Sequence, residues 1–287
     1  MVAAHGRFVW YELMTTDVDA AKAFYGRTLA WTAREAPETR YVIFAASEEP
    51  VAGATRLGPA AGAPHWIGYV GVDDVDKSAE TARALGGAIY RPPTDIAGIS
   101  RFAVVGDPQG AALALVKGRK TPPGRAGALD EPGRVGWHEL LTADWRAVLA
   151  FYSALFGWKK AAAHTGFMGA YQQFAVGAQT IGGMFDKPPE LPFPFWLYYF
   201  NVEAIEPAAE RVEAGGGHVH YGPIEAPGGA WIAHCADPQG AVFALLERRR
   251  AKPVGYFVTS VPERRAPRGG GASARGTTQR ELRDRAL

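Results

Sequence analysis

Cysteine is nearly absent from this chain, because Cys235 is the single cysteine among 287 residues. One cysteine excludes an intramolecular disulfide and a cysteine-based zinc cage, and it fits a reducing compartment. Long apolar runs are also missing: no stretch approaches the roughly 18–20 residues of a membrane helix, and residues 1–7 lack the apolar stretch of a signal peptide. These absences predict a soluble, cytoplasmic protein that does not interact with membranes.

A strong excess of one charge is also missing. The chain has 31 basic and 29 acidic side chains, and residues 251–287 alone hold eight Lys or Arg against three Asp or Glu. The rest of the chain is therefore slightly acidic and carries no electrostatic signature of nucleic-acid binding. Because residues 251–287 are rich in Gly and Arg and have no apolar period, we expect a disordered basic tail.

The most informative feature that is present is an internal repeat. Residues 6–31 and residues 133–158 share 12 identities in 26 ungapped positions, and the tetrad Asp107-Pro-Gln-Gly recurs at Asp237. Such self-similarity indicates duplicated structural units. It predicts one domain over residues 1–119, a Pro- and Gly-rich linker over 120–132, a second domain over 133–250, and the tail over 251–287.

A fainter repeat divides each domain into two modules, since Asp17-Val-Asp19 recurs as Asp74-Val-Asp76. Each module has an alternating apolar strand, an amphipathic helix and short strands, which predicts the order β-α-β-β-β four times. The predicted helices span residues 20–29, 75–85, 147–156 and 205–214. The two Asp-Pro-Gln-Gly tetrads predict type I turns that join the last two strands of each domain. We interpret them as structural.

These features together resemble the vicinal oxygen chelate superfamily, which includes glyoxalase I, bleomycin-resistance proteins and extradiol dioxygenases. The resemblance rests on the tandem modules, the run from Leu140 to Trp158 and the closing Asp-Pro-Gln-Gly hairpins. It implies an α+β fold in which four βαβββ modules pair into two glyoxalase-like domains with cupped mixed β-sheets. It implies no single activity, because the superfamily includes lyases, isomerases, epimerases, dioxygenases and binding proteins.

The resemblance also implies where metal ligands would lie. In the first domain these positions fall on Trp10 and Ile67 and near Ala54 and Ala114; in the second they fall on Trp137 and Leu197 and near Met184 and Ala244. None of these side chains is a usual ligand for a divalent cation. The sequence therefore predicts no metal and no other cofactor.

Two glutamates are the candidate catalytic residues. Strand alternation places Glu12 beside Trp10 on one face of the first domain, and Glu139 beside Trp137 on the equivalent face of the second. A carboxyl group on an apolar wall has a raised pKa, which suits a general base or acid. A structural carboxyl that bonds a neighbouring Tyr, Arg or backbone N–H is the alternative. The predicted ligand-binding residues are Trp10, Tyr69, Trp137, Tyr199 and Asn201, because aromatic walls with polar tips suit a planar ligand.

The sequence leaves three functions open for the two domains, in addition to a purely interactive role of the tail over residues 251–287. The first is recognition of a small aromatic or dicarbonyl-like molecule, with metal-independent isomerase or lyase chemistry if the protein is an enzyme. The second is sequestration of a toxic molecule without turnover, as in resistance proteins. The third is a metal-dependent glyoxalase or dioxygenase with non-standard ligands such as His218, His220 and Glu139. His234 and Cys235 are neighbours on a predicted strand and should point to opposite faces, so we do not predict a nucleophile–base pair. We expect a monomer or a homodimer.

Overall fold

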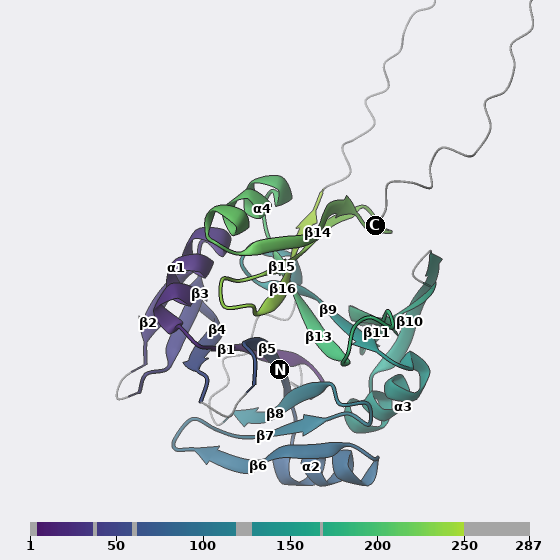
Figure 1. Cartoon of the computed structure of the whole chain (residues 1–287). Coiled ribbons are helices and arrows are strands. Elements are labelled where there is room, and N and C mark those ends of the chain that lie inside the picture. Colours follow the sequence, from purple (N-terminus) through teal and green to yellow (C-terminus); the bar gives the residue numbers. More distant parts are fainter. Residues whose placement is uncertain (1–4, 37–38, 59–61, 119–127, 167–168, 250–287) are drawn as a thin grey trace, which may run out of the picture. The chain divides into compact units, whose positions relative to one another are not determined.

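The computed structural model describes residues 5–36, 39–58, 62–118, 128–166 and 169–249. These residues form two eight-stranded mixed sheets, one from each half of the chain (Figure 1). The strand order is β2-β3-β4-β1-β5-β8-β7-β6 in the first sheet and β10-β11-β12-β9-β13-β16-β15-β14 in the second. The identical order confirms the predicted tandem α+β architecture. The predicted tail lies outside the described residues, as does most of the predicted linker.

The elements of the first half are β1 (Phe8–Thr15), α1 (Val18–Leu29), β2 (Thr32–Glu35), β3 (Val42–Ala46), β4 (Glu49–Arg56), β5 (His65–Gly71), α2 (Val75–Ala84), β6 (Ala88–Ile96), β7 (Ser100–Gly106) and β8 (Ala112–Gly118). After the short 3-10 helix η1 (Ala128–Asp130), the second half repeats this order with β9 (Val135–Thr142), α3 (Trp145–Phe156), β10 (Lys159–Gly166), β11 (Gly169–Val176), β12 (Gln179–Asp186), β13 (Phe195–Asn201), α4 (Ile205–Ala214), β14 (His218–Glu225), β15 (Ala230–Ala236) and β16 (Val242–Arg248). The four helices lie within two residues of their predicted bounds. No helix in the described ranges is long and apolar enough to span a membrane.

Acidic residues at the helix starts explain where three of the helices begin. The side chains of Asp17, Asp74 and Asp144 accept hydrogen bonds from backbone N–H groups in the first turns of α1, α2 and α3. These bonds satisfy N–H groups that have no partner inside the helix. The N-cap residue of α4 is Ala204, whose side chain cannot accept a hydrogen bond, and Glu247 of β16 accepts the Ile205 N–H instead.

Each sheet has two different faces. The face toward the helices contributes to one large buried cluster that includes Leu13, Phe24, Leu140 and Phe151 and spans both halves. The opposite face, which we call the inner face, carries a separate apolar cluster in each domain. Tyr69 and Phe102 belong to the first of these inner clusters; Leu141, Leu197 and Tyr199 belong to the second. The central strands β1 and β9 thus place Glu12 and Glu139 on the inner faces, as the alternation predicts.

Reciprocal contacts join the two domains. Helix α1 packs against α4 and α2 against α3, and each pair has one helix from each domain (Figure 1). The Tyr25 hydroxyl donates to Asp237, and the Tyr152 hydroxyl donates to Asp107, both over 3.0 Å. In the same way, the Trp31 indole N–H donates to a carbonyl of the second domain and the Trp158 indole N–H to a carbonyl of the first.

The Asp-Pro-Gln-Gly tetrads form the predicted turns. The Gly110 N–H donates to the Asp107 carbonyl, and the Gly240 N–H donates to the Asp237 carbonyl. The Asp107 side chain also accepts the N–H groups of Gln109 and Ala111 inside its own turn. The two repeated motifs therefore meet each other across the interface: the Tyr of one repeat binds the Asp of the other.

Candidate functional site

The inner face of the first domain brings together four polar or aromatic side chains from two strands and one loop. Tyr69 on β5 donates its hydroxyl proton to the Glu12 carboxyl over 2.5 Å, and Trp10 donates its indole N–H to the Tyr41 hydroxyl over 2.9 Å. Tyr69 lies directly opposite Trp10 in the β1–β5 pairing, which explains why the two bonds form side by side. The predicted residues Trp10, Glu12 and Tyr69 therefore share one site.

The second domain repeats this arrangement. Tyr199 donates to Glu139 over 2.7 Å, and Trp137 donates to the Tyr171 hydroxyl over 2.8 Å. Glu139 is more buried than Glu12, with 6% of its surface exposed. The predicted residues Trp137, Glu139 and Tyr199 therefore also share one site, built on β9 and β13.

A glycine next to each glutamate makes room for the tyrosine hydroxyl. Glu12 pairs with Gly53 on β4, and Glu139 pairs with Gly183 on β12. A Cβ atom at Gly53 would lie 1.9 Å from the Tyr41 hydroxyl, and one at Gly183 would lie 2.3 Å from the Tyr171 hydroxyl. Only a residue without a side chain lets these phenols cross the inner face at that point.

Substituting this glycine gives a first test of the site. We expect Gly183→Ala to displace the Tyr171 ring, to break its hydrogen bond with Trp137 and to lower the free energy of unfolding by about 1–3 kcal/mol. Tryptophan fluorescence of the folded protein reports the changed surroundings of Trp137, and chemical denaturation measures the loss of unfolding free energy. Gly58→Ala is the matched control, because a Cβ atom there meets nothing within 4 Å. Equal stability of the two variants would contradict the described contact.

Burial raises the pKa of both glutamates. For Glu139, burial is the largest effect, and the hydroxyl groups of Tyr199 and Tyr171 oppose it. For Glu12, burial again dominates, and it is opposed by the Tyr69 hydrogen bond and by the charge of Arg91. A carboxyl group whose pKa lies above its ordinary range exchanges a proton more readily near neutral pH, which is what general acid–base chemistry needs.

His234 extends the second site, although it is not one of the predicted site residues. Its Nε2 atom lies 2.8 Å from the Tyr199 hydroxyl. Burial and the neighbouring His220 lower its pKa to about 4, so the imidazole is neutral at neutral pH. A phenol has one proton, so a Tyr199 that donates to Glu139 accepts the Nε2–H of His234. The result is a chain of hydrogen bonds from Glu139 through Tyr199 to His234.

The two sites differ from the predicted residue set at three further positions. Asn201 is buried at the end of β13, and its amide donates to the carbonyl groups of Leu129 and Glu131, so it lies outside the hydrogen-bonded group around Glu139. Tyr41 and Tyr171 belong to the two sites although they were not predicted. Their signal was available, because the two tyrosines occupy equivalent positions in the repeat.

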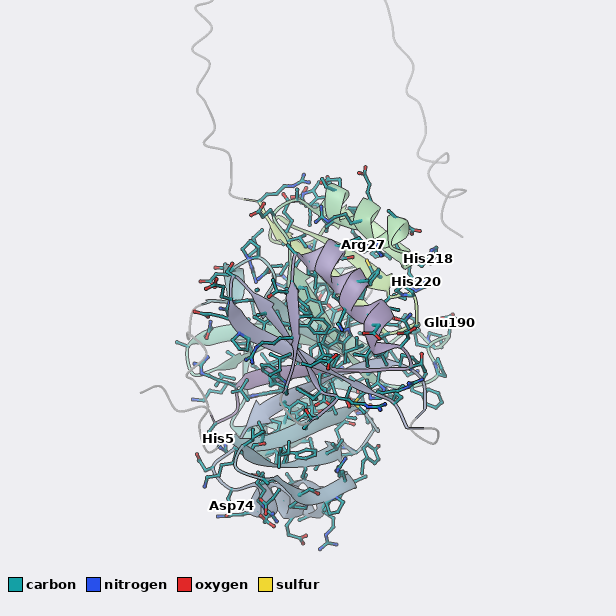
Figure 2. The ribbon with its side chains drawn as sticks, turned by 90° about the vertical axis from the view of Figure 1, so that its left-hand side faces the viewer. His5, Arg27, Asp74, Glu190, His218 and His220 are labelled. Atoms are coloured by element: carbon teal, nitrogen blue, oxygen red, sulfur yellow. The ribbon has the colours of Figure 1, made fainter. Side chains whose placement is uncertain are left out.

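The two histidines of the metal alternative lie at the edge of the second sheet, where His220 is close enough to His234 to lower its pKa. His218 and His220 are neighbours on the edge strand β14, with ring centroids 4.8 Å apart, and both are exposed (Figure 2). His218 faces Glu213 at 3.4 Å. Across the described ranges, no three His, Cys, Asp or Glu side chains come close enough together to hold a metal ion.

Comparison with known proteins identifies the family. The family model of the Glyoxalase/Bleomycin resistance protein/Dioxygenase superfamily matches residues 7–115 and 134–245. The chain belongs to this superfamily. A Mycobacterium tuberculosis protein named "Putative glyoxylase CFP32" is 32% identical over 83% of this chain and 93% of its own length. The "Anthracycline biosynthesis protein DnrV" of Streptomyces peucetius is 31% identical over 87% of this chain and 96% of its own length.

Solved structures of the superfamily share the fold. The Mn(II)-bound glyoxalase of Novosphingobium aromaticivorans superposes with a TM-score of 0.60 at 16% identity, covering 85% of this chain and 82% of that one. The 2,3-dioxygenase LapB of Pseudomonas sp. KL28 gives 0.61 at 12% identity, covering 89% and 96%. At these identities the likeness concerns the fold alone.

The superfamily's metal does not fit the side chains present at the centre of either inner face. The strand neighbours of Glu12 are Gly53 and Ile67, and those of Glu139 are Gly183 and Leu197. These side chains offer no donor atom, so a metal at either glutamate would find no second ligand among the residues paired with it. Ala54 and Met184, near which the resemblance places two ligand positions, face the helices and lie in the large core, next to Gly53 and Gly183.

Proposed function

We propose that the chain binds a small aromatic or dicarbonyl-like molecule on its inner faces, and that Glu139 transfers a proton on this molecule without a metal. The observation that carries the proposal is the buried Glu139 carboxyl, bonded through Tyr199 to His234. It lies among apolar and aromatic side chains of the inner face. The relatives named anthracycline biosynthesis proteins support a fused aromatic ligand, since anthracyclines are compounds of this kind.

The arrangement suits proton abstraction next to a carbonyl group. The Glu139 carboxylate takes the proton from carbon, and the electron pair moves to the carbonyl oxygen to form an enolate. Tyr199, no longer held by a carboxylate, turns its hydroxyl proton to that oxygen, while His234 continues to donate to the phenol. Return of the proton from Glu139 to another atom of the ligand completes an isomerisation. Each group lies within hydrogen-bond reach of the next, as such a transfer requires.

Deuterium exchange tests this chemistry directly. The probe is 2-tetralone, a bicyclic aromatic ketone with acidic C–H groups, incubated with the protein in D2O and followed by NMR. We expect the protein to accelerate exchange, and Glu139→Gln to reduce that rate at least about 100-fold. The dissociation constant of 2-tetralone, measured by quenching of tryptophan fluorescence, should change less than about threefold in this variant, because the amide keeps the shape of the site.

Glu12→Gln is the matched control in the first domain. Loss of exchange in this variant alone would assign the reaction to the first domain and contradict the role of Glu139. Binding without any exchange would identify a sequestering protein, the second function that the sequence left open. Absence of binding to both 2-tetralone and 1,4-dihydroxyanthraquinone would contradict the whole proposal.

Metal analysis completes the test. The protein, purified without chelator and supplied with excess Zn, Ni, Fe and Mn, should contain no stoichiometric metal by mass spectrometry, and a chelator should leave both the exchange rate and the melting temperature unchanged. A stoichiometric metal whose removal stops exchange would contradict the metal-independent mechanism. A cytoplasmic location, and a monomeric or homodimeric state, remain predictions.

A further inference from the structure

The two inner faces differ at a cross-strand pair of residues near their edges. Arg91 on β6 pairs with Val104 on β7, and Tyr221 on β14 pairs with His234 on β15. In both edge strands the register shifts immediately before and after this residue. The first domain therefore carries a guanidinium group where the second carries a phenol, and an isopropyl group where the second carries an imidazole.

Arg91 lies over the aromatic part of the first inner face. Its guanidinium carbon is 5.0 Å from the centroid of the Phe102 ring, and Phe102 packs beside Tyr69 at a centroid distance of 6.2 Å. Stacking on a ring fixes the plane of the guanidinium and leaves its N–H groups available at the edge. The charge of Arg91 also reaches Glu12 and Tyr69, since it lowers the pKa of both against the rise that burial causes.

This cation has no anionic partner in the part of the chain that the structure describes. Two other arginines of the same domain have such a partner: Arg83 pairs with Glu80, and Arg101 pairs with Asp76 and Asp95. No carboxylate of the described residues lies within 4.0 Å of the Arg91 guanidinium, although the side chain is exposed and able to find one. The Glu12 carboxyl, which burial disposes to hold its proton, is not bonded to it either.

The second domain offers different chemistry at the same place. Tyr221 is 43% exposed, and its ring lies 5.6 Å from that of His234, whose low pKa keeps it neutral. A phenol and a neutral imidazole accept and donate hydrogen bonds but add no positive charge.

We propose that the inner face of the first domain is a separate binding site for a small aromatic carboxylate. The ring of the ligand packs on Phe102 and Tyr69, and Arg91 holds the carboxylate through two parallel N–H bonds, the geometry that a guanidinium favours. The second domain selects the uncharged molecule of the proposed function. This inference rests on the proposed function only in that inner faces bind aromatic molecules.

A pair of probes with the same ring separates charge from stacking. Isothermal titration with 2-naphthoate measures binding of the carboxylate, and methyl 2-naphthoate measures binding of the uncharged ester. We expect wild-type protein to bind 2-naphthoate at one site per chain. Arg91→Tyr, which installs the residue that the second domain has at this position, should weaken 2-naphthoate binding at least tenfold and leave the ester within about twofold.

The reciprocal variant is the matched control. Tyr221→Arg should add a second 2-naphthoate site to the chain, while its melting temperature shows that the fold is intact. Equal binding of 2-naphthoate by wild type and Arg91→Tyr overturns the inference. If wild type binds the ester and not the carboxylate, the inference fails while the proposed function stands. If it binds neither, the inference fails, and binding of 2-tetralone decides the proposed function separately.

Discussion

Asp107→Ala is expected to lower the free energy of unfolding by about 3–5 kcal/mol, the largest effect of any single substitution considered for this fold. The Asp107 carboxyl accepts three hydrogen bonds: from the N–H groups of Gln109 and Ala111 and from the Tyr152 hydroxyl of the other domain. Alanine leaves these three donors without a partner, and the last two are buried. Urea denaturation followed by circular dichroism measures the loss.

Asp107→Asn separates the lost acceptor from the lost charge. Its amide oxygen can still accept both N–H groups of the turn, and its NH2 group can donate to the Tyr152 oxygen, so we expect a loss of about 1 kcal/mol. Asp237→Ala and Asp237→Asn should behave in the same way through Tyr25. If alanine and asparagine destabilise equally, the described hydrogen bonds do not account for the role of the tetrads.

The second large effect concerns acid stability. His138 is buried at the domain interface, where it stacks on Phe8, lies 2.6 Å from the Tyr11 hydroxyl and donates to the Ile181 carbonyl. Burial lowers its pKa from 6.5 to about 4. Between these two values the unfolded chain binds the extra proton and the folded chain does not. The stabilisation is therefore complete above pH 6.5 and declines as the pH falls toward 4, by about 2.5 kcal/mol between pH 7.5 and pH 4.5.

The comparison of His138→Gln with wild type isolates this contribution. Buried carboxyl groups such as Glu139 and Asp107 have raised pKa values, so their protonation adds stability as the pH falls and opposes the effect of His138 in both proteins. We expect wild type to lose about 2.5 kcal/mol more than the variant over this pH range. Parallel curves of unfolding free energy against pH would show that His138 does not titrate as the structure indicates.

Most of the fold could be predicted from the sequence because its signals are local and repeated. The helix starts follow from aspartate caps, and the closing hairpins follow from the Asp-Pro-Gln-Gly turns. The tyrosine that binds the aspartate of each Asp-Pro-Gln-Gly tetrad could not be predicted from such local signals. The Tyr25–Asp237 bond joins residues 212 apart, and nothing in the local pattern of either motif specifies the other.

The candidate site was predictable as far as strand alternation reached. Alternation placed Glu12 and Glu139 on the correct faces and separated Glu139 from His138. His234 was not predicted as a site residue, because alternation shows only that it points away from Cys235. Its pairing with Ala244 places it over the inner cluster. Alternation also assigned Asn201 to the site, although its amide donates to the carbonyl groups of Leu129 and Glu131, which precede the second domain.

The reciprocal Tyr–Asp bonds bear on how the two halves could come to differ. A contact in which each repeat binds the other through the same residues is the arrangement of a symmetric dimer. In a dimer of identical chains, a change at one site necessarily appears at both. Here the two halves belong to one chain, so one can carry Arg91 and the other Tyr221 behind an unchanged interface. Because both repeats belong to one chain, the interface between them can remain symmetric while the two inner faces carry different residues.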